Sequence, residues 1–163
     1  MARRTAKTRQ SELAAAFTDL GPAWGRWVTV CTPTASVSYI RLRLLRALEQ
    51  HGDQTMTTLA LSLNITQRRI TSLVAALVAD GLVSRAANPV DGRSTVISMT
   101  EPGRKHLETY WPQFQAAVSA AFGDIPAEQQ EQLLAITPVL TQALRNRIRL
   151  VAGDLGPLGR AFA

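Results

Sequence analysis

The stretch TQRRITSLVAALVADG, Thr66–Gly81, decides the fold of the chain. Its apolar residues recur at the spacing of one helical face and are Ile70, Leu73, Val74, Leu77 and Val78. The opposite face carries short polar and cationic residues at its start, namely Thr66, Gln67, Arg68, Arg69, Thr71 and Ser72. Arg68 and Arg69 are the only charged residues between Asp53 and Asp80. The pattern predicts an amphipathic helix whose first turns can bind anions and enter a DNA groove.

The segments around this helix predict a helix-turn-helix followed by a hairpin. A helix from about residue 36 or 38 to Gln50 comes first, and a short helix capped by Thr57 ends in a tight turn at Asn64-Ile65. After Thr66–Gly81, alternating apolar residues predict strands. The strand segments are Leu82–Ala87, Ser94–Met99 and a very short one at Thr55-Met56. This order is typical of a winged helix-turn-helix.

Long helices are expected on both sides of this core. One begins at Ser11 and should break or kink at Gly21-Pro22, a second is capped by Thr100, and a third starts at Pro126. The fold class is therefore mainly α (α+β), with six helices and a two- to three-stranded wing sheet. The expected parts are a disordered basic tail at 1–10, one domain at 11–151 with its winged core at 34–103, and a tail at 152–163.

Composition and charge restrict the class of protein. The 163 residues suit one domain with a real core, and no apolar run is long enough for a membrane span. A lone cysteine, Cys31, excludes an internal disulfide and fits the cytoplasm. The net charge of +6 is concentrated in the first ten residues and in 34–100. It indicates either a polyanionic partner or simply a basic soluble protein.

Aromatic residues are absent from the centre of the chain. All nine lie outside residues 40–109, so that block offers no rings on which single-stranded nucleic acid or RNA loops could stack. This favours reading of a duplex groove by a helix. The aromatic and apolar excess lies on the helices at 11–31 and 101–151, which either dimerise with a second copy or cover each other.

Other chemistry has little support in the sequence. His51 and His106 are isolated, and no cluster of Cys, His and carboxylate residues has metal-ligand spacing. No glycine-rich phosphate loop or nucleophilic triad is evident. We therefore expect no enzyme activity, no metal and no cofactor.

The sequence resembles the MarR family of bacterial transcriptional regulators over residues 36–103. The resemblance includes LRALEQHG at 45–52, LALSLNIT at 59–66 and RRITSLVAALVADGLVSR at 68–85. The most specific piece is the wing, NPVDGRSTVISMTEPG at 88–103, with Asp91-Gly92-Arg93 at its tip. Many members carry a second Arg where this chain has Gly92. The resemblance implies a homodimer, joined by its terminal helices, that binds a pseudo-palindromic operator and is often released by a small ligand or an oxidant.

The DNA-binding candidates combine the helix start with the wing. They are Thr66, Gln67, Arg68, Arg69, Thr71, Ser72, Arg85, Asp91 and Arg93, with Thr57, Thr58 and Arg41 or Arg43 as weaker phosphate candidates. Arginine can fork onto guanine, and Gln67 can address adenine. Arg93 suits the minor groove with Asp91 orienting it, although the two could simply form a surface ion pair.

The ligand candidates follow from the resemblance alone. They are Trp24, Trp27, Tyr39, Arg43 and Trp111, which would take a small aromatic or phenolic molecule, although these rings could equally be dimer core. Cys31 could be an oxidant-sensing thiol as in one branch of the family, or a small buried residue. The sequence thus predicts a sequence-specific, homodimeric repressor of transcription relieved by a ligand. The alternatives are an architectural or protein-interaction module of the same fold without a ligand response.

Overall fold

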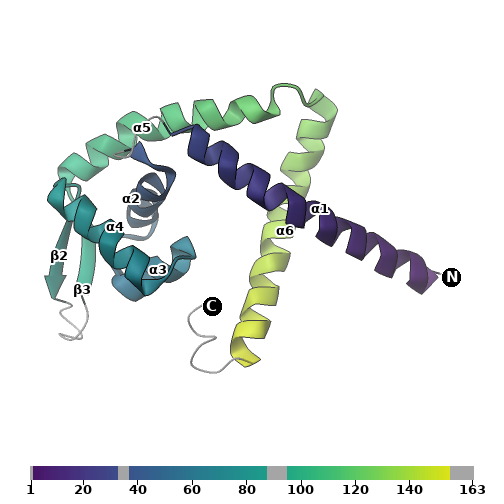
Figure 1. The fold of residues 1–163 in the computed structure, drawn as a ribbon, viewed down its shortest axis with the longest axis horizontal. Coiled ribbons are helices and arrows are strands. Elements are labelled where there is room, and N and C mark those ends of the chain that lie inside the picture. The colour runs from purple at the N-terminus through teal and green to yellow at the C-terminus, as the bar shows by residue number, and fades with distance from the viewer. Residues whose placement is uncertain (1, 33–36, 88–94, 155–163) are drawn as a thin grey trace. The chain divides into compact units, whose positions relative to one another are not determined.

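The computed structural model describes residues 2–32, 37–87 and 95–154 (Figure 1). The chain divides into two units, residues 1–39 and 40–163. The first unit consists mainly of helix α1 (Ala2–Val30). The second contains α2 (Tyr39–His51, which begins at the boundary), β1 (Gln54–Thr55), α3 (Met56–Leu63), α4 (Gln67–Ala79), β2 (Val83–Ala87) and β3 (Thr95–Met99), followed by α5 (Glu101–Ser119), the 3-10 turn η2 (Ala120–Phe122) and α6 (Ala127–Asp154).

The strands form one antiparallel sheet in the order β1-β3-β2. Arg85 pairs with Ile97 across β2 and β3, and Gln54 pairs with the same Ile97 from β1. Six helices and this three-stranded sheet confirm the predicted winged helix-turn-helix class. The short strand lies one residue earlier than predicted, at Gln54–Thr55.

The core of the second unit lies between α2, α3, α4 and the sheet. Its fully buried side chains include Leu42, Leu44, Leu45, Leu59, Ile70, Val74, Leu77, Ile97 and Leu107. The predicted apolar face of α4 is confirmed at Ile70, Val74 and Leu77, whereas Leu73 is half-buried and Val78 is exposed. Burying one such aliphatic side chain is worth about 1.5–3 kcal/mol, so this face fixes which side of α4 is left for solvent or a partner.

The helix α5 starts close against the sheet. The Thr100 side chain accepts a hydrogen bond from the Gly103 N–H at 3.1 Å, which is the predicted cap. Gly103 is buried, and the Thr100 hydroxyl also donates to the carbonyl of Gly81 at 2.6 Å. These contacts tie the end of the α4 segment to the beginning of α5.

Helix α1 differs from the sequence prediction in two respects. It begins at Ala2, not at Ser11, so residues 2–10 are helical where the sequence predicted a disordered tail. The reason is that Ala, Arg, Lys and Gln, with no Gly or Pro, favour helix even without an apolar stripe. Of the break or kink predicted at Gly21-Pro22, the break does not occur, because α1 continues through both residues.

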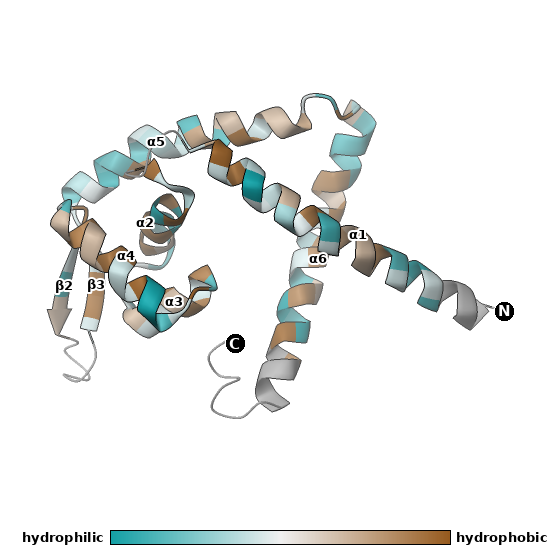
Figure 2. Cartoon of the chain, viewed as in Figure 1, coloured by the Kyte–Doolittle hydropathy of each residue, from teal (hydrophilic) through white to brown (hydrophobic). Residues whose placement is uncertain are grey.

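Helix α6 carries many exposed apolar side chains. Figure 2 shows hydrophobic residues recurring along it, and those exposed are Leu133, Leu134, Ile136, Val139, Leu144, Ile148 and Leu150. The helix begins at Ala127, directly after Pro126, and Pro138 lies inside it. It extends to Asp154, beyond the predicted end at 151. No described helix combines the length and the hydropathy that a membrane span needs.

Candidate DNA-binding surface

The turn between α3 and α4 is built from local backbone signals. Asn64 ends α3 in the left-handed conformation, with φ 53°, and the Ile65 N–H returns to the carbonyl of Ala60 at 3.0 Å. Thr66 is extended, and its hydroxyl oxygen accepts from the Arg69 N–H at 3.3 Å. The predicted tight turn at Asn64-Ile65 is confirmed, and Thr66 is the N-cap of α4. Because Thr66 supports this end of α4, the remaining N–H groups of the first turn point outward and can bind an anion.

Three cations surround the start of α4. Arg68 and Arg69 are exposed, and neither forms an ion pair with another described residue. Arg85 comes from β2, and its guanidinium lies 3.5 Å from the Thr71 carbonyl oxygen. The structure therefore brings the predicted wing residue beside the predicted reading helix. Successive helix residues point about 100° apart, so Arg68 and Arg69 address different directions.

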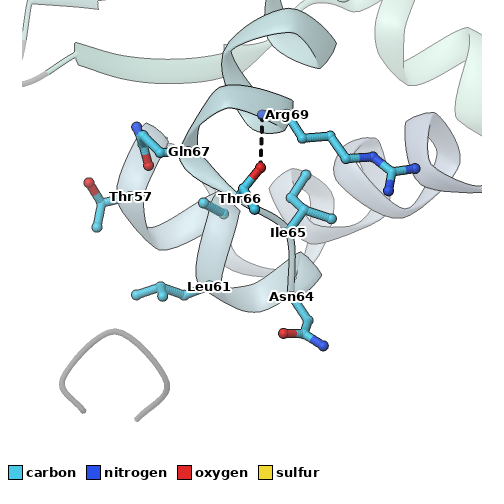
Figure 3. A pocket seen from close by; sticks show the side chains of 8 residues that line it. Thr57, Leu61, Asn64, Ile65, Thr66, Gln67 and Arg69 are labelled. Carbon is cyan, nitrogen blue, oxygen red and sulfur yellow. Dashed lines mark hydrogen bonds between the residues drawn. The ribbon is translucent and has the colours of Figure 1, made fainter. Parts of the chain in front are cut away.

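A groove of about 600 Å³ opens where α3 meets α4 (Figure 3). Its lining residues are Thr57, Ala60, Leu61, Asn64, Ile65, Thr66, Gln67 and Arg69. Gln67 and Thr57 lie on one side of the turn, while the Arg69 side chain runs in the opposite direction. The groove thus offers amide, hydroxyl and methyl groups on one side and a cation on the other.

The two hydroxyl groups farther along α4 bond to their own helix. Thr71 donates to the Gln67 carbonyl at 2.8 Å, and Ser72 donates to the Arg68 carbonyl at 3.2 Å. A phosphate only accepts hydrogen bonds, so either hydroxyl must leave its carbonyl before it can bind one. Both residues remain exposed.

Several weaker phosphate candidates have other roles. Arg41, a predicted phosphate candidate, is instead buried and paired with Asp80. Arg43 donates to the carbonyls of Ser62 and Leu63 at the end of α3. The residue that caps α3 is Thr55, two positions before the predicted Thr57, because its side chain accepts from the Thr58 N–H. Thr57 and Thr58 remain exposed at the start of this helix.

Asp91 and Arg93 lie outside the described residues. Their roles at the tip of the wing remain predictions from the sequence, as do those of the surrounding turn residues. The strands that lead to and from the tip, β2 and β3, are described through Ala87 and from Thr95.

The ligand candidates are distributed over both units. Trp24 is exposed and Trp27 half-buried on α1, and Tyr39 is half-buried at the start of α2. On α5, the Trp111 ring lies 5.7 Å from that of Phe114, and the Arg46 guanidinium stands 5.4 Å over it. Cys31 is half-buried just after α1. A ligand or oxidant role for these residues remains a prediction.

His106 on α5 is a polar residue that sequence reasoning left isolated. Its Nε2 atom is buried without a hydrogen-bond partner among the described residues, and its ring centroid lies 4.6 Å from that of Tyr110. Burial lowers the pKa of His106, the nearby positive charge of Arg41 lowers it further, and Asp80 opposes both effects. The side chain is therefore neutral at physiological pH.

We expect acid to destabilise the fold through His106. Because its folded pKa lies below the ordinary 6.5, the unfolded chain binds more protons as pH falls through that range, and stability is lost. Urea unfolding at about pH 7.5 and about pH 5.5 should show a smaller loss for His106→Gln than for the wild type. His51→Gln, which removes the exposed histidine at the end of α2, should keep the full loss. If His106→Gln lost as much free energy of unfolding as the wild type on acidification, His106 would be excluded as the cause of the acid sensitivity.

Fold and surface together define a winged helix-turn-helix protein whose reading helix presents cations. The sequence pattern of the MarR family matches residues 35–94. The curated relatives that match parts of the chain are named as HTH-type transcriptional regulators, and solved structures that share its fold include MarR-family regulators.

Known proteins resemble it at moderate identity. The HTH-type transcriptional repressor YetL of Bacillus subtilis is 31% identical over 96 residues, which cover 58% of each chain. Sco3205 of Streptomyces coelicolor, a MarR-family regulator solved in complex with DNA, is 24% identical with a TM-score of 0.66 and covers 83% of this chain and 91% of its own. BpsR of Bordetella bronchiseptica is 19% identical, also with a TM-score of 0.66, and covers 78% and 98%. The chain spans 50% to 76% of the curated relatives' lengths.

Proposed function

We propose that the chain acts in the cytoplasm as a homodimeric repressor that binds a pseudo-palindromic operator through α4 and the wing. We further propose that a small aromatic or phenolic ligand releases it. The observation that carries DNA reading is the exposed cation set of Arg68, Arg69 and Arg85 around the cap of α4. Cations are slightly unfavourable at a helix start, and an anionic partner explains why two stand there.

The dimer is supported by apolar surface that each long helix leaves exposed. Besides the α6 residues given above, α1 exposes Leu13, Phe17, Leu20, Trp24 and Val30. Apolar surface of this extent is typical of helices that meet a second copy. A two-fold dimer requires two half-sites of opposite direction, about 34–36 Å apart for each helical turn of DNA between them.

The ligand class is supported by one structural neighbour and by residue type. DNA binding by BpsR of Bordetella bronchiseptica is regulated by 6-hydroxynicotinic acid, an aromatic acid with a ring hydroxyl. In the present chain, Trp24, Trp27, Tyr39 and Trp111 supply rings, and Arg43 supplies a cation that suits such an acid. The competing function is an architectural or protein-interaction module of the same fold, which would bind no ligand.

Selection of genomic fragments by the purified protein tests the proposal. Fragments retained at physiological salt should share an inverted repeat, and the protein should bind it at least about a thousandfold more tightly than random DNA. Sedimentation at micromolar concentration should give twice the chain mass. Equal affinity for the selected and random duplexes would leave only the architectural function. A sedimenting mass equal to one chain would contradict the proposed dimer.

Arg93→Ala should weaken binding to every duplex to a similar degree. An arginine in the minor groove is attracted mainly by the negative potential of the groove and much less by the identity of the bases. Its loss should therefore reduce the slope of the logarithm of the association constant against the logarithm of the salt concentration by about one unit. The measurement is affinity for the selected operator and for random DNA at several salt concentrations. Unchanged affinity for both would mean that Arg93 forms only a surface ion pair with Asp91.

A further inference from the structure

A cluster of polar side chains lies at the C-terminal end of α4, opposite the end that faces DNA. Arg41 comes from α2, Asp80 from the end of α4, and His106 and Tyr110 from α5. Arg41 is the one buried charged side chain among the described residues, with 8% of its surface exposed. A buried cation is costly without a partner, and the partner here is the Asp80 carboxylate, which binds the Arg41 Nη2 atom.

The Arg41–Asp80 pair links α2 to the C-terminal end of α4. Arg41 and Asp80 are 39 residues apart in sequence. Asp80 is the C-cap of α4, where an acid faces the negative end of the helix dipole and is unfavourable. The Arg41 cation offsets the negative charge of Asp80 and also the negative end of the helix dipole. Because Asp80 does not stabilise α4 by itself, its stabilising effect at this position comes from its contact with Arg41 on α2.

A small change of angle at the Asp80 end of α4 causes a large displacement at its N-terminal end. Thirteen residues of α helix span about 20 Å, so a rotation of about 10° about the Asp80 end moves Gln67 and Arg68 by roughly 3 Å. Hydrogen bonds between side chains and bases tolerate far smaller errors in donor–acceptor distance. The angle of α4 against α2 must therefore be fixed tightly for any one register on DNA.

We propose that Arg41 is a positioning residue for DNA binding, which acts through Asp80 to fix the angle of α4 against α2. This inference rests on the proposed reading of DNA by α4. Because Arg41 itself is buried, we expect it to make no direct contact with DNA. Its loss should therefore lower discrimination between operator and random DNA, while the general electrostatic attraction to any duplex changes little.

The test is a double-mutant cycle on DNA binding with the full chain. Arg41→Met should reduce affinity for the selected operator about tenfold, which matches the coupling energy of contacting residues, and should leave random-DNA affinity almost unchanged. Asp80→Asn should cause a similar loss. The double variant should lose no more than either single variant, because both act through one contact. Circular dichroism and urea unfolding establish that each variant is folded under the binding conditions.

Two further variants separate positioning from charge and stability. Arg46→Met removes one cation from the same helix but leaves the Arg41–Asp80 pair, and it should keep operator affinity. Arg41→Lys keeps the charge without the fork and should restore part of the loss, and it carries the test where Arg41→Met does not fold. Full operator affinity in folded Arg41→Met, or additive losses in the double variant, would overturn the inference. Absence of operator preference in the wild type would instead overturn the proposed function.

His106 provides a readout that a merely structural loss would not move. The chain has two histidines, so their imidazole signals can be assigned from His51→Gln and followed by NMR. Removing the Arg41 charge should raise the pKa of His106, and removing the Asp80 charge should lower it. Shifts in these opposite directions, together with equal losses of operator affinity, place both residues in one cluster. A pKa of His106 that moves in neither variant would show that the two charges do not lie beside the imidazole, and it would overturn the cluster on which the inference rests.

Discussion

Gly103→Ala should destabilise the chain by about 3 kcal/mol, at the upper end of what overpacking costs. A Cβ atom at this position would lie 2.0 Å from the Leu82 carbonyl oxygen and 3.0 Å from its carbonyl carbon. Both atoms belong to backbone that is already held, since Leu82 accepts a hydrogen bond from the Thr100 N–H at 3.2 Å. The clash cannot be relieved by rotating a side chain, so the Leu82 backbone, just before β2, and the start of α5 must separate.

Urea unfolding measures this loss directly. Gly123→Ala is the matched control, because its Cβ would meet only the Ala120 carbonyl oxygen at 3.4 Å, and its free energy of unfolding should change by at most about 0.5 kcal/mol. A loss below about 1 kcal/mol in Gly103→Ala would mean that α5 does not approach the sheet this closely. Operator binding by the variant should also weaken, because β2 carries Arg85 beside α4.

The parts of the site that follow from local chemistry could be predicted from the sequence. Thr66 as N-cap, Asn64 at the turn and Gly81 in the left-handed region, with φ 70°, each depend on a few neighbouring residues. The buried face of α4 depends only on periodicity. These local preferences are kept in the folded chain because the tertiary contacts here favour the same conformations.

The burial of Arg41 could not be predicted from its charge. Its position fits the buried stripe of α2, since 41, 44, 45 and 48 share one helical face, but its charge suggested solvent exposure. The partner that makes burial tolerable, Asp80, lies on another helix, and no local pattern connects the two. Long-range pairing of this kind, like the covering of the exposed apolar residues on α1 and α6, depends on tertiary or quaternary contacts that residue spacing does not encode.

Arg68→Ala and Arg69→Ala should each relax operator preference at a different base pair. A bidentate arginine–guanine contact is worth about 1–3 kcal/mol of discrimination, so each variant should lose about 10- to 100-fold at one position and little elsewhere. The positions should differ because the two side chains leave the helix in different directions, and Arg69 runs away from Gln67 (Figure 3). Affinities for a set of operators that each carry one substituted base pair would locate the positions.

Arg145→Ala on α6 controls for the loss of one positive charge, since its exposed side chain lies far along the chain from α4. It should keep the operator preference of the wild type at every position. Phosphate contact by Arg68 or Arg69 would produce a different result: a uniform loss over all operators and a salt slope lower by about one unit. The pattern of loss thus decides whether this end of α4 reads base edges or only holds the backbone. Base reading requires that the loss be confined to one position for each arginine.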